Sequence, residues 1–405
     1  MVLADVVVVG GGPAGSAAAI TLARAGREVV LVDKARFPRD KICGDGLTAG
    51  ALRLLEELGL PPDAVPSWQA VHDVVVTSPS HRMLTFPLPR DRGLFAVVAR
   101  RAELDAALLD VARAAGVKVH DGHAVTAATE RADRVVLEVD GMEPVTARYA
   151  IGADGMWSPM RKHLGLATPG YLGEWHAFRQ YFTDVGPRAA RDLFVWFEPD
   201  LLPGYAWSFP LPGGGANVGF GIQRAGGRVA RVQDMKALWP ALLERPHIRA
   251  ILGPDARPES PHRAWPIPAR IDDIALTSAR TLFVGDAAAA TDTMTGEGIG
   301  QALLTGVLAA RAISKGGLDP LTVTASYQRG VRAALVADHR MSLLLVRALR
   351  HRKGARAALR VAGANAWTRR NFARWLFEDY PRAILATPRR WHRGMLHGPG
   401  AYQPL

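Results

Sequence analysis

The chain has 405 residues, 48% of them hydrophobic, so it is long enough to bury large cores in two or more domains. Cys43 is its only cysteine, which excludes an intrachain disulfide and favours a reducing compartment. No apolar run approaches the ~20 residues that a membrane-spanning helix needs. No basic segment with a cleavage site precedes the first apolar run, so no signal peptide is expected and the predicted location is cytoplasmic.

The net charge of +12 is concentrated at one end of the chain. From Arg340 onward there are fourteen arginines and lysines and only two acids, Glu378 and Asp379, so the rest of the chain is balanced. A localised basic segment predicts an anionic partner, such as a lipid surface, a nucleic acid or an acidic protein.

The first predicted elements follow the order of a dinucleotide-binding unit. A continuous apolar run at 5–9 predicts a strand buried on both faces, and an alanine-rich stretch at 16–25 predicts the helix after it. A second apolar run at 28–32 ends in Asp33, where a carboxylate can accept hydrogen bonds from ribose hydroxyls.

The turn between this strand and helix is rich in glycine. Gly10 suits the tight turn, Gly12 lets the backbone approach a pyrophosphate, and Gly15 lets the helix pack close to the strand. The helix N-terminus adds free N–H groups and a partial positive charge for the phosphates. The pattern predicts a nucleotide cofactor without separating FAD from NAD.

The middle of the chain changes character. Up to residue 149, the pattern predicts helices at 48–58 and 101–115, a hairpin at 71–77 and 83–88, a strand at 117–120, and an antiparallel pair at 135–139 and 146–149. Aromatic, β-prone segments then predict an antiparallel sheet in a second domain, at 176–182, 193–197, 205–210 and 216–222.

No second glycine turn lies between a strand and a helix, because Gly213–Gly215 falls inside the aromatic sheet and is typical of a hairpin turn. We therefore expect no nicotinamide domain. The electron donor, NAD(P)H or a small redox protein, is expected to bind only transiently.

The second half of the chain is mostly helical. A helix is predicted at 229–252, residues 264–268 return the chain to the first domain, a buried strand covers 281–284, and a long helix covers 296–313. From residue 322 the chain is predicted to be helical, with breaks at Gly354, Pro381 and Pro388.

Three separated motifs carry a family resemblance: the glycine turn with Asp33, Gly152-Ala-Asp-Gly155 with Ser158 and Arg161, and Gly285-Asp286 followed by Gly296-Glu-Gly-Ile299. Over residues 4–315 the chain resembles the para-hydroxybenzoate-hydroxylase type of FAD-dependent oxidoreductase. Within that group, Lys41-Ile-Cys-Gly-Asp-Gly46 and Pro203-Gly-Tyr-Ala-Trp-Ser-Phe-Pro210 resemble the geranylgeranyl reductase family. Those enzymes saturate isoprenoid double bonds in archaeal lipids, prenyl diphosphates and menaquinone tails.

The resemblance implies an FAD site built from distant segments. Besides Gly10, Gly12 and Gly15, the implied contacts are Ala14, Asp33, Cys43, Gly44, Gly46, Arg101, Val125, Asp154, Asp286, Gly298 and Ile299. Arg100 competes with Arg101, which better fits an Arg-x-x-Leu-Asp spacing. The helix that opens at Gly296–Gly300 can point its N–H groups at the flavin pyrimidine edge, with helix-entry flexibility as the alternative explanation of these glycines.

The predicted fold class is α/β: a Rossmann-like FAD-binding domain, a second antiparallel-sheet substrate domain and a helical C-terminal tail. The predicted FAD-binding domain is discontinuous, at 1–70, 95–165 and 264–330. The predicted substrate domain covers 71–94 and 166–263, and the basic helical region covers 331–405.

The aromatic strands predict a slot for a prenyl chain. Tyr205, Trp207 and Phe209 share one strand face. The other residues expected to line the slot are His176, Phe178, Gln180 and Phe182 on a second strand and Phe194 and Trp196 on a third. An ordinary aromatic core is the alternative for each, and Tyr205 and Trp207 are the favoured site residues because each carries a polar group.

Reduction of an isolated alkene requires hydride from the flavin and a proton for the other carbon. The sequence offers Tyr205, Cys43, His176 and Tyr181 as proton donors without ranking them. Tyr205, Trp207 and Cys43 are the predicted catalytic residues, although Cys43 also suits a small packing role. No metal site is predicted.

The basic tail alternates arginines with apolar residues and tryptophans between Leu344 and Trp375. This pattern predicts a peripheral contact with an anionic membrane, where a prenylated lipid or quinone resides. A helical cap on the FAD domain with a solvated basic face is the alternative. Nucleic-acid binding is not expected, because the basic residues form no recognisable module.

Three functions remain open. The first is an FAD-dependent reductase of an isoprenoid chain. The second is an FAD-dependent monooxygenase or halogenase acting on an aromatic or polyketide-type metabolite. The third is an electron carrier at the membrane surface that leaves the lipid unmodified. The scarcity of lysine beyond Lys34 and Lys41 of the nucleotide half counts modestly against a halogenase.

Overall fold

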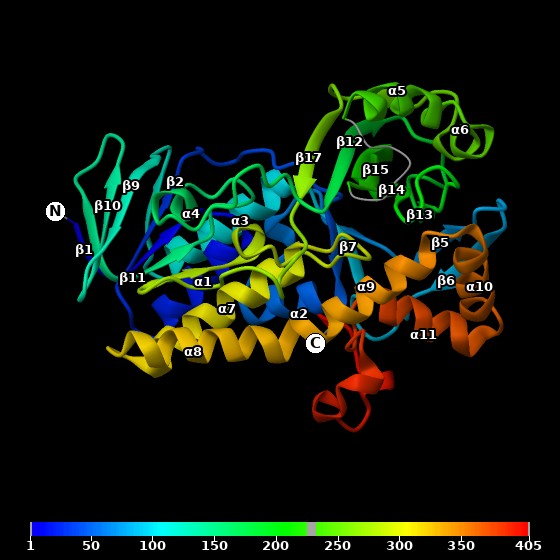
Figure 1. Cartoon of the computed structure of the whole chain (residues 1–405). Coiled ribbons are helices and arrows are strands. Elements are labelled where there is room, and N and C mark those ends of the chain that lie inside the picture. Colours follow the sequence, from blue (N-terminus) through cyan, green and yellow to red (C-terminus); the bar gives the residue numbers. More distant parts are fainter. Residues whose placement is uncertain (1, 225–231, 404–405) are drawn as a thin grey trace.

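The computed structural model describes residues 2–224 and 232–403 of the chain. Two large sheets lie side by side, with a helical layer running beneath both (Figure 1). A small third sheet joins β3 (Gly46–Thr48), β7 (Ala96–Val98) and β4 (Gln69–Ala70).

The first sheet has seven strands in the order β8-β2-β1-β11-β10-β9, with β18 pairing with β11. Its parallel part consists of β8 (Lys118–Asp121), β2 (Val29–Asp33), β1 (Val2–Val9), β11 (Val145–Gly152) and β18 (Thr281–Phe283). The antiparallel pair β9 (Val125–Glu130) and β10 (Val135–Val139) extends it. α1 packs on β1, and Val6, Val7 and Val8 are fully buried in the core that this strand shares with the neighbouring strands and helices.

Several helices pack around this sheet and against one another. They are α1 (Pro13–Arg24), α2 (Ala49–Glu57), α3 (Arg101–Ala114), α4 (Pro159–His163), α7 (Ile299–Gly316) and α8 (Pro320–Val331). α1 and α7 are in very close contact: a Cβ atom on Gly306 would lie 2.2 Å from the Ala14 carbonyl oxygen. Gly15 packs as the sequence predicts, since its Cβ would lie 1.8 Å from the Gly10 carbonyl oxygen.

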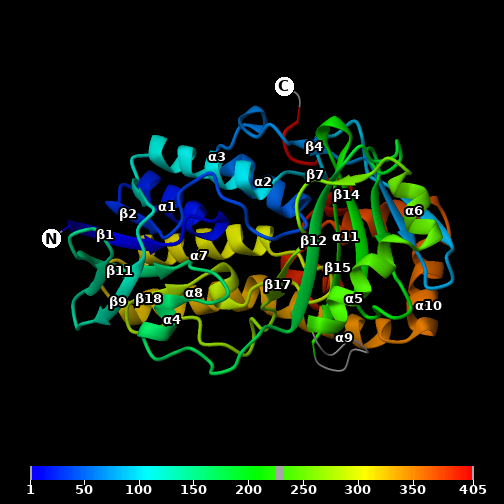
Figure 2. The same ribbon diagram turned by 90° about the horizontal axis from the view of Figure 1, so that it is seen from above.

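The second sheet has eight strands and is mostly antiparallel, as predicted, with β13 and β5 as the parallel pair. The strands are β5 (Asp73–Thr77), β6 (Met83–Pro87), β12 (Trp175–Thr183), β13 (Leu193–Trp196), β14 (Tyr205–Leu211), β15 (Gly215–Gln223), β16 (Arg257–Pro258) and β17 (Arg263–Ile267). Helices α5 (Val232–Leu243) and α6 (Pro246–Leu252) cover one face (Figure 2).

The C-terminal helices continue from α8 through a π-helical turn at Arg332–Val336 into α9 (Ala337–Leu349), α10 (Arg352–Ala362) and α11 (Ala366–Leu376). Leu359, Ala362 and Phe377 share a core with Val74 and Phe86 of the second sheet. Short 3-10 turns follow, and Ala401 bridges back to Leu94. The tail therefore packs as a cap against the body of the protein.

Three local predictions need correction. The segment 229–252 forms two helices because Pro246 starts a new one; its residues 229–231 lie outside the described part of the chain. Gly354 lies inside α10, where a Cβ would lie 2.1 Å from the Ala348 carbonyl oxygen, so it serves close packing and does not end a helix. Residues 263–267 pair with β12, so the chain returns to the first sheet only at β18.

Among the described residues, we find no helix that combines the length and the apolar character needed to cross a membrane.

The α1–α7 contact can be tested with two glycines of neighbouring helices. We expect Gly306→Ala to lower the free energy of unfolding by ~1–3 kcal/mol or more, because the added methyl group collides with backbone. Gly330→Ala in α8 is the matched control: its Cβ meets only Leu308 Cδ2, at 3.4 Å, so it should raise stability by roughly 0.5–1 kcal/mol. Denaturant titration measures both. Equal effects would contradict the proposed closeness of the two helices.

Candidate functional site

A cavity of about 970 Å³ lies where the two sheets and the C-terminal helices meet. Every residue predicted to contact the cofactor lines it except Gly15, whose role is packing. Tyr205 and Trp207 line it too. The cavity is at the upper end of the ~300–1,000 Å³ typical of small-molecule sites.

One end of the cavity is built for phosphate. Gly10 has φ of +107° in the tight turn, and the N-terminus of α1 follows it. At Gly12 a Cβ atom would have no neighbour nearer than Arg39 Nη2 at 3.5 Å and Arg101 Nη2 at 3.9 Å, so the backbone faces open space between two guanidinium groups. Helix N–H groups and two arginines form a suitable cradle for a pyrophosphate.

Asp105 holds these two arginines in place. Its fully buried carboxylate accepts two hydrogen bonds of 2.8 Å from Arg101 and one of 2.9 Å from Arg39. Arg101 is thus the arginine of the site, whereas Arg100 forms an ion pair with Glu259. Asp105 lies one turn after Arg101 on α3. It is the last residue of the Arg-x-x-Leu-Asp motif, but the motif did not show that it orients the two arginines.

Two further acids of the predicted set lie near this end. Asp33 accepts hydrogen bonds from the Gly11 N–H at 2.7 Å and the Ala35 N–H at 2.8 Å, so its carboxylate is oriented by the backbone. Asp154 accepts from Ser158 Oγ at 2.6 Å and from the Met160 N–H, and burial raises the pKa of Asp154. Val125 lines the cavity beside them.

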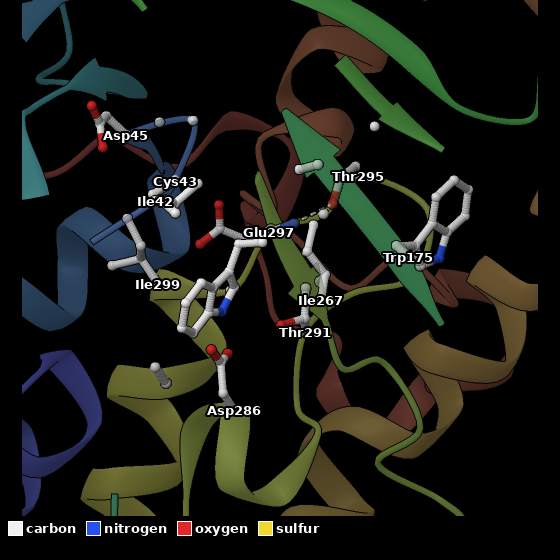
Figure 3. Close-up of a pocket in the computed structure, with 18 of the residues that line it drawn as sticks. Ile42, Cys43, Asp45, Trp175, Ile267, Asp286, Thr291, Thr295, Glu297 and Ile299 are labelled. Atoms are coloured by element: carbon white, nitrogen blue, oxygen red, sulfur yellow. Dashed lines mark hydrogen bonds between the residues drawn. The ribbon is translucent and has the colours of Figure 1, made fainter. Parts of the chain in front are cut away.

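Asp286 marks another part of the cavity (Figure 3). Lys41 Nζ lies 3.5 Å from Asp286 Oδ2 and 4.2 Å from the centroid of the Trp265 ring. Burial lowers the pKa of Lys41, and the Asp286 carboxylate opposes that effect. Lys41 lines the same cavity as the predicted cofactor contacts.

The Gly296–Ile299 turn opens α7, with Gly298 at the N-cap and Ile299 as the first helical residue. Both line the cavity, so a helix N-terminus faces it from this side as well. Glu297 also lines it, and Glu297 Oε1 accepts a hydrogen bond of 2.6 Å from the Gly300 N–H.

The loop of Cys43, Gly44 and Gly46 packs beneath β14. A Cβ on either glycine would lie 3.3 Å from Phe209 Cε2, a tight contact that shows how closely the loop approaches this ring. Trp207 Nε1 donates to Asn217 Oδ1 at 3.0 Å, and Asn217 Nδ2 donates to the Cys43 carbonyl at 2.9 Å. Asn217 therefore ties the aromatic strand to the loop.

Asp45 sits at the bend of this loop, with φ of 64° and no solvent exposure. It accepts hydrogen bonds from Tyr181 Oη at 2.6 Å and from Asn217 Nδ2 at 2.9 Å. Burial raises the pKa of Asp45 to about 6, against the lowering effect of Arg179. Asp45 was not among the predicted site residues. It stands between two glycines, which pointed to a role for the backbone at this place and not for a side chain.

The predicted catalytic residues are all neutral in this environment. Burial raises the pKa of Tyr205, and its hydroxyl donates to the Thr295 carbonyl. Burial likewise raises the pKa of the Cys43 thiol. Of the other two proton-donor candidates, neither faces the cavity: His176 contacts Arg224 and Tyr181 contacts Asp45.

Of the residues predicted to line a slot, those on β14 line the cavity, and those on two other strands do not. On β12 the cavity is lined by Trp175, Ala177 and Arg179, and on β13 by Leu193 and Val195. The residues predicted instead lie on the opposite face: Phe178, Phe182, Phe194 and Trp196 pack in the core under α5 and α6, and Gln180 bonds Trp239 of α5. Both faces of these strands are almost wholly buried and both carry apolar residues, so the alternation could not tell which face lines the cavity.

The remaining wall comes from the C-terminal helices. Leu345 and Leu349 of α9, Leu359 of α10, and Phe372 and Trp375 of α11 line the cavity. Val361 and Trp367 line it too, yet they are 69% and 58% exposed, so the cavity reaches the surface at α10 and α11.

A possible metal cluster lies away from this cavity. His81, Glu198 and His247 bring three ligand atoms within 4.8 Å of one another. Glu198 is already engaged with Arg245 and with His247 Nε2. Both carboxylate oxygens of Glu198 therefore already have a partner, Oε2 in Arg245 and Oε1 in His247.

Asp105 gives a direct test of the phosphate end. We expect Asp105→Asn to weaken FAD binding to the apoprotein about 10–100-fold, because charge-assisted bonds of ~1.5–3 kcal/mol that orient both arginines are lost. Titration of flavin fluorescence measures the affinity. Asp110→Asn is the control on the same helix, since it removes only an exposed pair with Arg113. Unchanged affinity in Asp105→Asn would refute the assignment.

Comparisons with known proteins agree with this geometry. The family model described as FAD binding domain matches residues 3–206. The chain is 36% identical over 375 residues to the menaquinone reductase of Mycolicibacterium smegmatis, covering 84% of each protein. It is 31% identical over 323 residues to digeranylgeranylglycerophospholipid reductase 1 of Methanopyrus kandleri, covering 75% of this chain and 79% of that protein.

Two solved structures are also similar. A geranylgeranyl bacteriochlorophyll reductase-like protein from Thermoplasma acidophilum superposes with a TM-score of 0.80 at 20% identity, covering 96% of this chain and 100% of that one, which shows the shared fold. The flavin-dependent halogenase CmlS has a TM-score of 0.70 at 27% identity, covering 86% of this chain and 65% of that one. Together with the FAD cradle, these matches establish that the chain belongs to the geranylgeranyl reductase family of FAD-dependent oxidoreductases.

Proposed function

We propose that this protein saturates carbon–carbon double bonds in the isoprenoid chain of a quinone or lipid, which it takes up from an anionic membrane surface. The single observation that carries this proposal is the continuity of the cavity. The same space is lined by Gly12 and Asp33 at the nucleotide end and by apolar side chains of α9, α10 and α11 at the other. A long apolar chain that enters between these helices would reach the residues around Cys43 and Tyr205.

The residues present fit FAD. Arg101, Arg39 and the start of α1 would hold the pyrophosphate, Asp33 and Asp286 the hydroxyls, and the start of α7 the flavin. Reduced FAD supplies the hydride when bound, and NAD(P)H or a small redox protein is the proposed transient donor.

The chain's own contribution is an apolar, water-poor place for the alkene. Trp207 and Phe209 present rings to the cavity, and their strand is fixed to the Cys43 loop through Asn217. Tyr205 keeps its proton on Oη, which donates to Thr295. Exclusion of water and a fixed orientation of the double bond are what such a reduction requires of its site.

The reaction can be tested on the FAD-loaded protein kept reduced without oxygen. Menaquinone in anionic vesicles should gain two hydrogens per saturated bond, read by mass spectrometry. Oxidation of the flavin with no change in the mass of the isoprenoid chain would refute the reductase and favour the electron carrier. Incorporation of oxygen or halogen into an aromatic metabolite in air would favour the monooxygenase or halogenase, the alternative supported by the similarity to CmlS.

Membrane contact is proposed at the basic face of α10 and α11. Arg356, Arg360 and Arg370 are exposed on the same two helices as Val361 and Trp367, which line the cavity and are themselves exposed. Such a face suits anionic lipid headgroups with apolar side chains inserted between them. Peripheral attachment would bring the lipid substrate to the opening of the cavity.

The double variant Arg356→Gln/Arg360→Gln should weaken binding to anionic vesicles roughly thirtyfold, since each basic residue near such a surface contributes about 1 kcal/mol. The control is Arg131→Gln/Arg134→Gln on the β9–β10 turn, at the opposite end of the molecule (Figure 1). Vesicle sedimentation at low and high salt gives the affinities. If both pairs of substitutions have the same effect, α10 is not the contact surface.

A further inference from the structure

The C-terminal segment brings a second group of charged residues to the start of α7. Asp292 and Glu297 precede this helix, and Glu378 and Arg382 follow α11. Arg382 lies 3.3 Å from Asp292 and 2.8 Å from Glu378. Asp292, Glu297 and Arg382 are each no more than 9% exposed, and the Glu378 side chain is 20% exposed, so three carboxyl groups lie around one arginine in a largely buried place. Full ionisation of all three would leave an uncompensated buried charge.

The contacts decide which acid is charged. Asp292 accepts from Ser342 Oγ at 2.6 Å and from the Thr295 N–H at 2.8 Å in addition to Arg382. Burial alone would raise the pKa of Asp292. Arg382 and Ser342 outweigh this effect and hold the pKa below its ordinary value. Glu378 accepts from Arg382 and, at 2.8 Å, from Gln301 Nε2. These contacts favour the carboxylate of each acid, although burial still raises the pKa of Glu378 above its ordinary value.

Glu297 has much weaker support for a charge. Its Oε1 accepts from the Gly300 N–H, and no hydrogen bond to Oε2 is found within residues 2–224 and 232–403. Burial, followed by the charge of Glu378, raises the pKa of Glu297 to about 8. The other groups that face it are Cys43 and Tyr205, both neutral, and the charged Arg382 and Asp292. Keeping a proton on this carboxyl group therefore costs less free energy than ionising it.

Glu297 is also the member of the group that faces the cavity. It lines the cavity with Cys43 and Ile299, and Figure 3 shows its carboxyl directed to their side. We infer that Glu297 is a carboxylic acid at neutral pH, with its proton on Oε2, and that it supplies the proton consumed when the double bond is reduced. Glu378, delivered by the C-terminal segment, keeps it protonated.

This inference rests on the proposed function, and the step balances as follows. One alkene carbon takes the hydride that reduced flavin supplies. The O–H bond of Glu297 breaks as a C–H bond forms at the other carbon. The resulting carboxylate takes up a proton from solvent before the next turnover. A general acid of this kind contributes about 10²–10⁴ in rate.

The proton itself can be observed without substrate. Infrared difference spectra between pH 7 and pH 9.5 should show a protonated-carboxyl band that titrates near pH 8 and is missing in Glu297→Gln. Glu378→Gln should move the midpoint down by a pH unit or more, because the repelling charge is gone. Glu198→Gln, a buried glutamate outside the cavity, is the control and should leave the band unchanged. A band that survives in Glu297→Gln would overturn the inference.

Stability gives an independent readout with a defined sign. The folded state holds the Glu297 proton with a pKa of about 8, against an ordinary value of 4.5, so its stabilising effect is complete below about pH 4.5 and is lost as pH rises to about 8. The Tm of the wild type should therefore fall relative to Glu297→Gln across this window and run parallel to it above pH 8. A constant difference in Tm would contradict the inference.

Activity then separates the two proposals. If the wild type saturates isoprenoid bonds, Glu297→Gln should oxidise its reduced flavin with the alkene about 100-fold more slowly, while the donor reduces the flavin at an unchanged rate. Equal rates would remove Glu297 as proton donor and leave the reductase intact. If the wild type saturates no bond, the proposed function fails, and the infrared and stability results still report on the proton.

Discussion

The close contact of α1 with α7 is the constraint on which the rest of the site depends. Gly306 allows α7 to approach the first turn of α1 at Ala14, and this brings the N-termini of two helices to one cavity. One N-terminus lies beside the arginines held by Asp105, and the other lies at the Gly296–Ile299 turn. The two helices are nearly in backbone contact, so a cofactor with a phosphate end and a flavin end can reach from the N-terminus of α1 to the N-terminus of α7.

The second sheet and the tail complete the same cavity from opposite sides. β14 offers its aromatic face and is tied to the Cys43 loop by Asn217, which binds both. The tail supplies apolar walls from α9, α10 and α11. Its arginines have two different roles: Arg374 and Arg382 are buried in ion pairs with Asp379 and Asp292, whereas Arg356 and Arg360 remain exposed. Charge at the surface and charge in the core therefore come from the same basic segment.

The buried acids show how a neutral group is maintained near the cavity. Asp292 and Glu378 have strong donors, and Glu297 has a single backbone N–H. One arginine cannot neutralise three carboxylates in a place with little water. One of the three carboxyl groups, Glu297, therefore keeps its proton. The same logic leaves Tyr205 and Cys43 neutral, because neither has a positive partner strong enough to favour its anion.

The sequence by itself determined the nucleotide half. Local order of strand, glycine turn, helix and acid is enough to place Gly10, Gly12 and Asp33, because each role depends on neighbours within about thirty residues. It also determined that Tyr205, Trp207 and Phe209 share a face, since side chains alternate along a strand. Only the tertiary structure decided which face of β12 and β13 lines the cavity, because both faces are almost wholly buried and both carry apolar residues. The tertiary structure alone also brought Glu378 and Arg382 to Glu297, and Asp105 to Arg39. Contacts between residues far apart in the chain, or between a helix and a loop, follow from packing and leave no periodic signal in the sequence.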